Sequence, residues 1–304
     1  MGKAWLVGIM ALLAGRAAAQ PTIRWIHRGT HLVVDDRWVL DPESGTFTPT
    51  RYPATGAPRT FAVSPSGELE AMLTGSEAST FRHGPAGGPL GPELRVPRLL
   101  SATRAPDGVQ RLAFWASERV LVFREASTPH QEEVACRAFD VVTRRWSPAA
   151  CPMGDFNVVW RVEPGPGGWL AISSAGEGHP GVLFARYDVK RGQGKSAGPS
   201  IDEYPFGPVD ATFTLDGKGL LLATPCLLER EEPRPCEDLP EQNAPWRIYA
   251  WSFTEKKLVL RRDDLPETLL PSPRGHLFAW SEKARVCVEP LANNATTPRC
   301  FPLP

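Results

Sequence analysis

The sequence predicts an all-β protein, a β-propeller of six four-stranded blades. The first observation is a unit seen in SPSGELEAML at 64–73, a tight Pro-Gly turn followed by an apolar run. Its glycines recur at Gly29, Gly67, Gly108, Gly167, Gly217 and Gly275, in steps of 38, 41, 59, 50 and 58 residues. The second observation is that no 12-residue segment of the mature chain combines apolar 3.6 periodicity with freedom from Pro and Gly. A unit repeated at this spacing indicates a repeat architecture.

Each repeat supplies four strands. Pro presets φ at the first turn position and Gly supplies the positive φ, so the turn reverses the chain between two strands. The run after the turn is nearly continuous in copies such as 219–223, as expected for a strand packed on both faces. A second hairpin follows at 38–49, 136–148, 183–195 and 248–260. Six such units arranged radially make a propeller; five or seven blades are the alternative counts.

The first 19 residues are predicted to be a cleavable signal peptide. Lys3 is the basic end, 4–14 the apolar region, and Ala17-Ala18-Ala19 the cleavage site before Gln20. Residues 20–304 then form a single propeller domain, periplasmic or secreted, with no later segment long enough to span a membrane. Without Lys3 and Arg16 the chain has 32 basic and 34 acidic residues, a net charge of −2. This balance argues against nucleic acid as a partner.

In chain order we place the blades at 20–52, 53–97, 98–154, 155–205, 206–265 and 266–304. RVLVFRE at 119–125 is an extra strand candidate in the third blade, and the Pro-rich segment 225–245 interrupts the fifth. The innermost strands are expected to precede the Pro-Gly turns, as TIRWI, RTFAV, LLSATR, VVWRV, ATFT and TLLPS. Trp115 and Trp280 are expected in equivalent strands, packing between blades.

Six cysteines in the mature chain fit an oxidising compartment. They fall into three local pairs, Cys136 with Cys151, Cys226 with Cys236, and Cys287 with Cys300. The first and third pairs are symmetric about 143–144 and 293–294, so a hairpin centred there would place the partners opposite each other. Spacing alone does not fix connectivity, but local disulfides are the prediction.

The turn and following strand resemble the TolB-type six-bladed propeller repeat. The residues that carry the resemblance are Ser64-Pro65-Ser66-Gly67, Pro106-Asp107-Gly108 with Leu112-Ala113-Phe114-Trp115, Asp216-Gly217, and Ser272-Pro273-Arg274-Gly275 with Phe278-Ala279-Trp280-Ser281. The resemblance extends over most of 22–304 as spacing. It departs from the repeat at 164–167, which has no Asp, and in the first copy, which has no Pro. It implies the fold and an adaptor-like role in the cell envelope.

Searches for catalytic or metal-binding signatures give no site. There is no G-x-S-x-G or H-E-x-x-H motif, and the six histidines never fall at metal-ligand spacing. We therefore expect no catalytic residue, no metal and no cofactor. The irregular segments 126–133, 175–181 and 225–245 are expected between second and third strands, on one face of the disc. Insertions on one face of a repeat array often mark a binding surface.

The predicted function is an exported interaction or scaffold module that binds a protein partner of the cell envelope. Its expected contact residues lie in the three irregular segments: His130, Gln131, His179, Glu229, Arg230, Glu231, Glu232 and Arg234. Two alternatives are a propeller hydrolase or lactonase with a metal in the central channel, and a carbohydrate-binding envelope protein. The innermost strands, read as apolar and hydroxyl-rich with scattered Arg and no acidic residue, favour the binding module.

Overall fold

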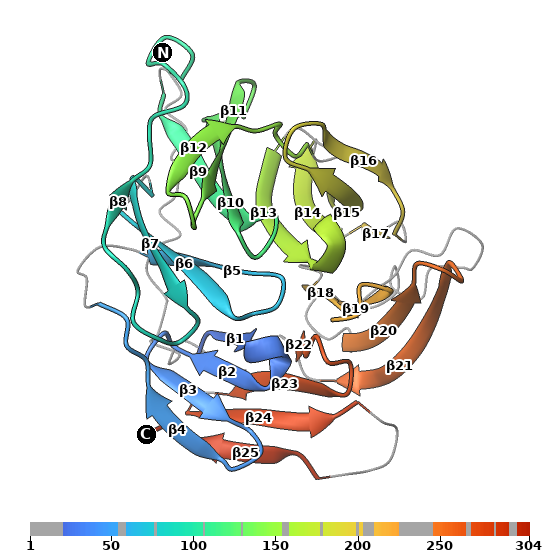
Figure 1. Cartoon of the computed structure of the whole chain (residues 1–304). Helices are drawn as coiled ribbons and strands as arrows, with labels where there is room; N and C mark the ends of the chain where they lie inside the picture. Colours follow the sequence, from blue (N-terminus) through green and yellow to red (C-terminus); the bar gives the residue numbers. More distant parts are fainter. Residues whose placement is uncertain are drawn as a thin grey trace, which may run out of the picture.

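The computed structural model places six antiparallel sheets in a ring (Figure 1). It describes residues 21–53, 59–75, 78–105, 107–128, 130–153, 158–176, 179–198, 201–202, 210–224, 246–265, 269–282, 284–291 and 297–304. The predicted signal peptide, the loop 229–234 and the pair Cys226 and Cys236 lie outside these residues. Within them, every sheet is a consecutive stretch of chain, so the all-β six-bladed propeller is confirmed.

The strands of the first three blades follow one another from the axis outward. Blade 1 contains β1 (Ile23–Ile26), β2 (His31–Val34), β3 (Trp38–Asp41) and β4 (Thr46–Pro49). Blade 2 contains β5 (Arg59–Val63), β6 (Leu69–Thr74), β7 (Thr80–Pro85) and β8 (Leu94–Arg95). Blade 3 contains β9 (Val109–Trp115), β10 (Val120–Ser127), β11 (Val134–Asp140) and β12 (Arg145–Pro148).

The other three blades repeat this order. Blade 4 contains β13 (Val158–Gly165), β14 (Trp169–Gly176), β15 (His179–Asp188) and β16 (Gly192–Ser196), with the short β17 (Ile201–Asp202) also beside β15. Blade 5 contains β18 (Asp210–Phe213), β19 (Gly219–Thr224), β20 (Trp246–Ser252) and β21 (Lys257–Leu265). Blade 6 contains β22 (Leu270–Pro271), β23 (Leu277–Glu282), β24 (Arg285–Pro290) and β25 (Arg299–Pro302). Two 3-10 turns, η1 (His27–Gly29) and η2 (Pro166–Gly168), follow β1 and β13.

The third blade corrects the expected strand order. Its innermost strand is β9, which follows the turn at 107–108, and RVLVFRE belongs to the second strand β10. The two strands pair along seven residues, from Val109↔Ser127 to Trp115↔Leu121. The segment expected to be innermost is held differently, because the backbone N–H groups of Leu99 and Leu100 donate to the buried carboxylate of Glu125 (3.2 and 2.9 Å). At 99–100, hydrogen bonds to the Glu125 side chain therefore replace backbone pairing with a neighbouring strand.

This shift also moves one tryptophan. Trp115 lies on an innermost strand and Trp280 on a second strand, so the two positions are not equivalent. Both side chains are nevertheless buried. The Trp115 indole N–H donates to the carbonyl of Ala62 in blade 2 (2.9 Å), which joins the two blades.

The core consists of apolar clusters between neighbouring blades. Four large clusters fill the interfaces between blades 2 and 3, 3 and 4, 4 and 5, and 5 and 6, and a fifth joins blade 6 to blade 1. Blades 1 and 2 share only a small cluster of Ile26, Val33 and Ala86. At that interface polar contacts do much of the joining, as described below.

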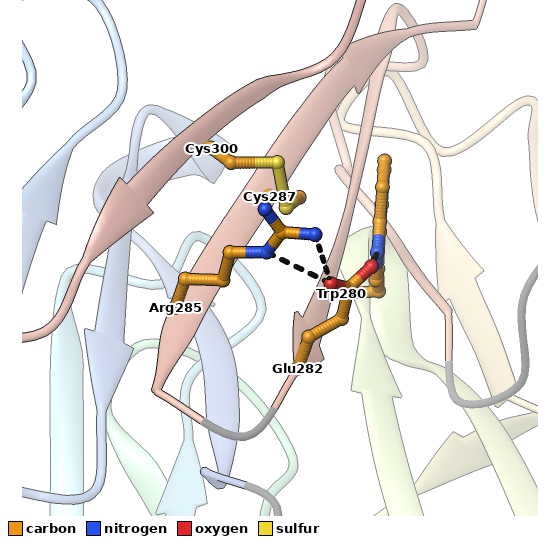
Figure 2. Close-up of a disulfide and its surroundings, with 5 residues drawn as sticks. All are labelled: Trp280, Glu282, Arg285, Cys287 and Cys300. Carbon is orange, nitrogen blue, oxygen red and sulfur yellow. Dashed lines mark hydrogen bonds and ion pairs between the residues drawn. A yellow bond between two sulfur atoms is a disulfide. The ribbon is translucent and has the colours of Figure 1, made fainter.

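Two of the three predicted disulfides lie within the described residues, and both are present. Cys136 bonds to Cys151 with their Cα atoms 5.2 Å apart, and Cys287 bonds to Cys300 with their Cα atoms 4.0 Å apart. In blade 6, Trp280 lies opposite Cys287, which lies opposite Cys300, so one row of side chains crosses three strands. Beside it, Trp280 and Arg285 both donate to Glu282 (Figure 2).

Candidate functional site

An axial pocket of about 370 Å³ is the candidate site. It is lined by the innermost strands of all six blades, β1, β5, β9, β13, β18 and β22. Gly29, Gly67 and Pro273, from the turns that end three of these strands, also line it. Five of these strands run toward Pro-Gly turns, and β9 runs toward the bend at 116–119, so the pocket reaches the face of the disc where these turns lie.

Arginines recur at one level of the innermost strands. Arg59, Arg111 and Arg161 each lie four residues before the last residue of β5, β9 and β13. Arg111 and Arg161 line the pocket, as does Arg24 of β1. The sequence reasoning missed this set because it took 99–104 for the third innermost strand. The constant offset becomes visible only with the strand ends of the structure, because the expected strand of blade 4 ended at Val162 rather than Gly165.

Carboxylates hold these guanidinium groups. The Arg111 Nε donates to Glu125 (2.7 Å), and the Arg161 Nε donates to Glu163 (2.7 Å). Glu163 lines the pocket itself, so the expectation of innermost strands without an acidic residue was wrong. The strand simply continues past the five residues read from the sequence, to Gly165.

The densest polar cluster joins blades 1 and 2. Arg24 donates to Asp36, to the buried Glu70 (2.6 Å) and to the hydroxyl of Tyr52 (3.0 Å), and its guanidinium lies 4.1 Å from the ring centre of Phe61. Burial lowers the pKa of Arg24, but the nearby carboxylates of Glu70 and Asp36 outweigh it, so the pKa is raised overall. The same burial, with Glu70 alongside, raises the pKa of Tyr52. Arg24 is therefore permanently charged and fixed in place.

Contacts between turns link blades 1, 2 and 3 at the pocket mouth. The N–H groups of His27 and Arg28 donate to the carbonyls of Gly67 and Ser66 (both 2.8 Å), which joins the turns of blades 1 and 2. The backbone N–H and hydroxyl of Ser66 donate in turn to Glu118 of blade 3 (2.7 and 2.8 Å). The mouth is consequently held by the blades together rather than by any single loop.

The residues expected to contact a partner lie in different surroundings. His130 is exposed in the loop between β10 and β11. Gln131 is only 4% exposed, and its side-chain amide bonds to both the N–H and the C=O of Val159 in blade 4 (3.0 and 3.2 Å). It is committed to joining blades 3 and 4. His179 begins β15, and Glu229, Arg230, Glu231, Glu232 and Arg234 lie outside the described residues.

The described residues contain neither a metal-binding cluster nor a membrane-spanning helix. No group of three or more His, Cys, Asp or Glu side chains is arranged to hold a metal ion in this part of the chain. Over the same residues, no helix has the length and apolar character needed to cross a bilayer.

Comparisons with known proteins show the fold. No protein-family model and no curated protein sequence matches the chain. The crystal structure of TolB from Acinetobacter baumannii is similar over 93% of this chain, with a TM-score of 0.51 and 13% identity. This chain spans 63% of that TolB chain. An uncharacterized protein from Listeria monocytogenes (TM-score 0.49, 9% identity) and a periplasmic gluconolactonase from Pseudomonas aeruginosa (0.44, 13%) are also similar, over 92% and 94% of this chain and 97% and 99% of theirs.

Proposed function

We propose that this chain is an exported β-propeller that binds a protein partner in the cell envelope and carries out no reaction. The observation that carries the proposal is the state of the charges around the axial pocket. Glu163 in the pocket wall and Glu70 and Glu125 behind it are each bonded to an arginine at 2.6–2.7 Å. A general base or nucleophile works best when its charge is available to substrate. Glu70 and Glu125 are fully buried and stabilise the wall, whereas Glu163 and its partner Arg161 are more than a third exposed and offer hydrogen-bonding groups to the pocket.

The compartment supports this role. Two hairpin disulfides suit an oxidising environment. The predicted signal peptide would deliver the chain there. The TolB-like fold is compatible with an adaptor, although fold alone does not determine function.

The proposal is tested by measuring how a larger side chain in the pocket changes the binding of a partner. Thr60 is exposed in the pocket wall, and Thr48 is exposed on the outer strand β4. Mature wild-type protein carrying a photo-crosslinker would be used to identify a partner in envelope extract, followed by a binding measurement with that purified partner. Thr60→Trp should raise the Kd for this partner by about tenfold or more. A tenfold change in Kd corresponds to roughly 1.4 kcal/mol of binding free energy. Thr48→Trp, the matched control, should bind as wild type.

Equal binding by Thr60→Trp and wild type would remove the pocket from the contact surface. The predicted contact segment 229–234 would then be tested by replacing it with a short Gly-Ser linker, which should abolish capture if that segment is the contact. Turnover of a lactone by the mature protein, lost in Glu163→Gln, would overturn the binding role in favour of an enzyme.

A further inference from the structure

A second hollow lies between blades 5 and 6, on the same face as the Pro-Gly turns. This groove has a volume of about 640 Å³. One wall comes from the turn after β18 and from β20 and β21, and the other from the turn after β22. Pro273 lines both this groove and the axial pocket, so the two adjoin.

The groove is open because the apolar packing lies elsewhere along the interface. The cluster between blades 5 and 6 contains Trp246, Ile248 and Leu265, from the end of the blade farther from the Pro-Gly turns. Toward those turns the apolar side chains that line the groove include Ala250 and Val259. These two side chains are too small to fill the space between the two blades.

Positive charge lines the groove. Lys218, Lys257, Arg261 and Arg274 are all exposed, together with His276. Among the residues that the structure describes, none of these four Lys and Arg side chains forms an ion pair, in contrast to the arginines of the axial pocket. Arg274 donates one hydrogen bond, from Nε to the carbonyl of Arg28 (3.3 Å).

The two carboxylates of the groove do not cancel this charge. Asp216 accepts hydrogen bonds from the Thr214 hydroxyl (2.7 Å) and the Lys218 N–H (3.0 Å) and so belongs to its own turn. Glu255 is the other. The groove has four permanent cations and two carboxylates, so it carries a local excess of positive charge in a chain whose formal net charge is zero. Such a patch attracts and orients anionic partners.

We propose that this groove binds an acidic, extended peptide segment. The cations come from three separate segments, and Lys257 and Arg261 are four residues apart on one strand, roughly 13 Å. Charges spread over this length do not converge on one compact anion such as phosphate. They match carboxylates spaced along an extended chain, which would lie over the apolar floor of Ala250 and Val259. The inference does not depend on binding in the axial pocket.

The probe is a fluorescein-labelled peptide of alternating Glu and Gly, titrated into the mature protein and followed by fluorescence anisotropy at two salt concentrations. The groove variant is Lys257→Glu with Arg261→Glu. The matched control is Lys190→Glu with Arg191→Glu, which makes the same charge change at two exposed positions of the β15–β16 hairpin. The groove variant should bind the peptide about tenfold or more weakly, whereas the control should bind as wild type.

Thermal unfolding of both variants checks that they fold. Thr60→Trp should bind the acidic peptide normally, which separates this site from the axial pocket. Three results would each overturn the proposal: no binding of the peptide by wild type, equal weakening in both double variants, or unchanged binding when Gln replaces Glu in the peptide. Binding of dextran sulfate or tripolyphosphate in the groove without binding of the peptide would also overturn it.

Discussion

Two buried arginines of the third blade have opposite electrostatic surroundings. Arg111 and Glu125 are 5% and 0% exposed and form an ion pair at 2.7 Å. Arg124, 1% exposed, donates from Nη1 to the Gln131 Oε1 (2.9 Å), and its Nε has no partner among the described residues. Burial lowers the pKa of Arg124 to about 10. A buried charge without a counter-charge reduces the stability of the folded state. In a buried ion pair, removal of one partner leaves the other charge uncompensated and is therefore strongly destabilising.

This contrast predicts different effects of the same substitution. Arg111→Met leaves Glu125 buried without its cation and should reduce the free energy of unfolding by about 3–5 kcal/mol. Arg124→Met removes a poorly compensated charge, and Gln131 keeps the Val159 N–H as a donor to its Oε1. Its unfolding free energy should therefore stay within about 1 kcal/mol of wild type or rise. Urea denaturation of both variants measures this, and an equal loss in the two would contradict it.

At the scale of elements, the hairpins between the third and fourth strands of blades 1, 3 and 4 share one capping device. Asp41, Asp140 and Asp188 each end a third strand and accept backbone N–H groups two or three residues further on, as Asp140 does from Val142 and Thr143 (3.0 and 2.9 Å). The pKa of each carboxyl is lowered, chiefly by the hydroxyl of Ser44 at Asp41, by Arg119 at Asp140, and by the Arg191 N–H at Asp188. An ionised side chain is thus part of each hairpin.

Stability should consequently fall in acid. A carboxyl whose pKa is lower in the folded chain stabilises fully above its unfolded value, about 4, and loses that contribution as the pH falls through the folded value. The triple variant Asp41→Asn, Asp140→Asn, Asp188→Asn should be less stable than wild type at pH 7, and the difference should shrink steadily below about pH 4. Thermal unfolding across pH 2–7 tests this. Asp107→Asn, a change at an exposed turn residue, is the control, and a pH-independent difference for the triple variant would contradict the prediction.

At the scale of the whole molecule, the ring closes without strand exchange between its ends. In the described part of the chain blade 1 comes wholly from the N-terminal side and blade 6 wholly from the C-terminal side, side by side in Figure 1. They are joined by an apolar cluster, by the Trp25 indole N–H donating to the Leu270 carbonyl (2.9 Å), and by the Ser272 hydroxyl donating to the Gly29 carbonyl (3.0 Å). Closure therefore depends on side-chain fit at one seam.

Two glycines in corresponding turns test this seam. Gly29 and Gly275 have φ of 74° and 78°, so alanine strains the backbone similarly at both, by about 1–2 kcal/mol. A Cβ at Gly29 would lie 2.5 Å from the Ser272 Oγ and 2.7 Å from the Pro273 Cδ, whereas a Cβ at Gly275 would meet nothing within 4 Å. Gly29→Ala should therefore lose a further 1–3 kcal/mol or so of unfolding free energy relative to Gly275→Ala. Equal losses in urea denaturation would show that the seam tolerates displacement.

Local patterns of residues were enough to predict the repeat, the all-β class, the six blades and the two hairpin disulfides that lie within the described residues. These features depend on local chemistry. A Pro-Gly turn, an apolar run and an Asn-Asn centre between Cys287 and Cys300 act over a few residues, and the repeat multiplies the signal.

The identity of the innermost strand in the third blade, and the set of side chains that meet at the axis, depend on contacts between distant parts of the chain. The turn at 107–108 has a residue pattern like the others, but it precedes its innermost strand, and the backbone at 99–100 is bonded instead to Glu125, 26 and 25 residues further along the chain. The pairs of Arg24 with Glu70 and of Gln131 with Val159 likewise join residues of different blades. Such contacts depend on how the blades are placed around the axis, a relation that no local pattern of residues specifies.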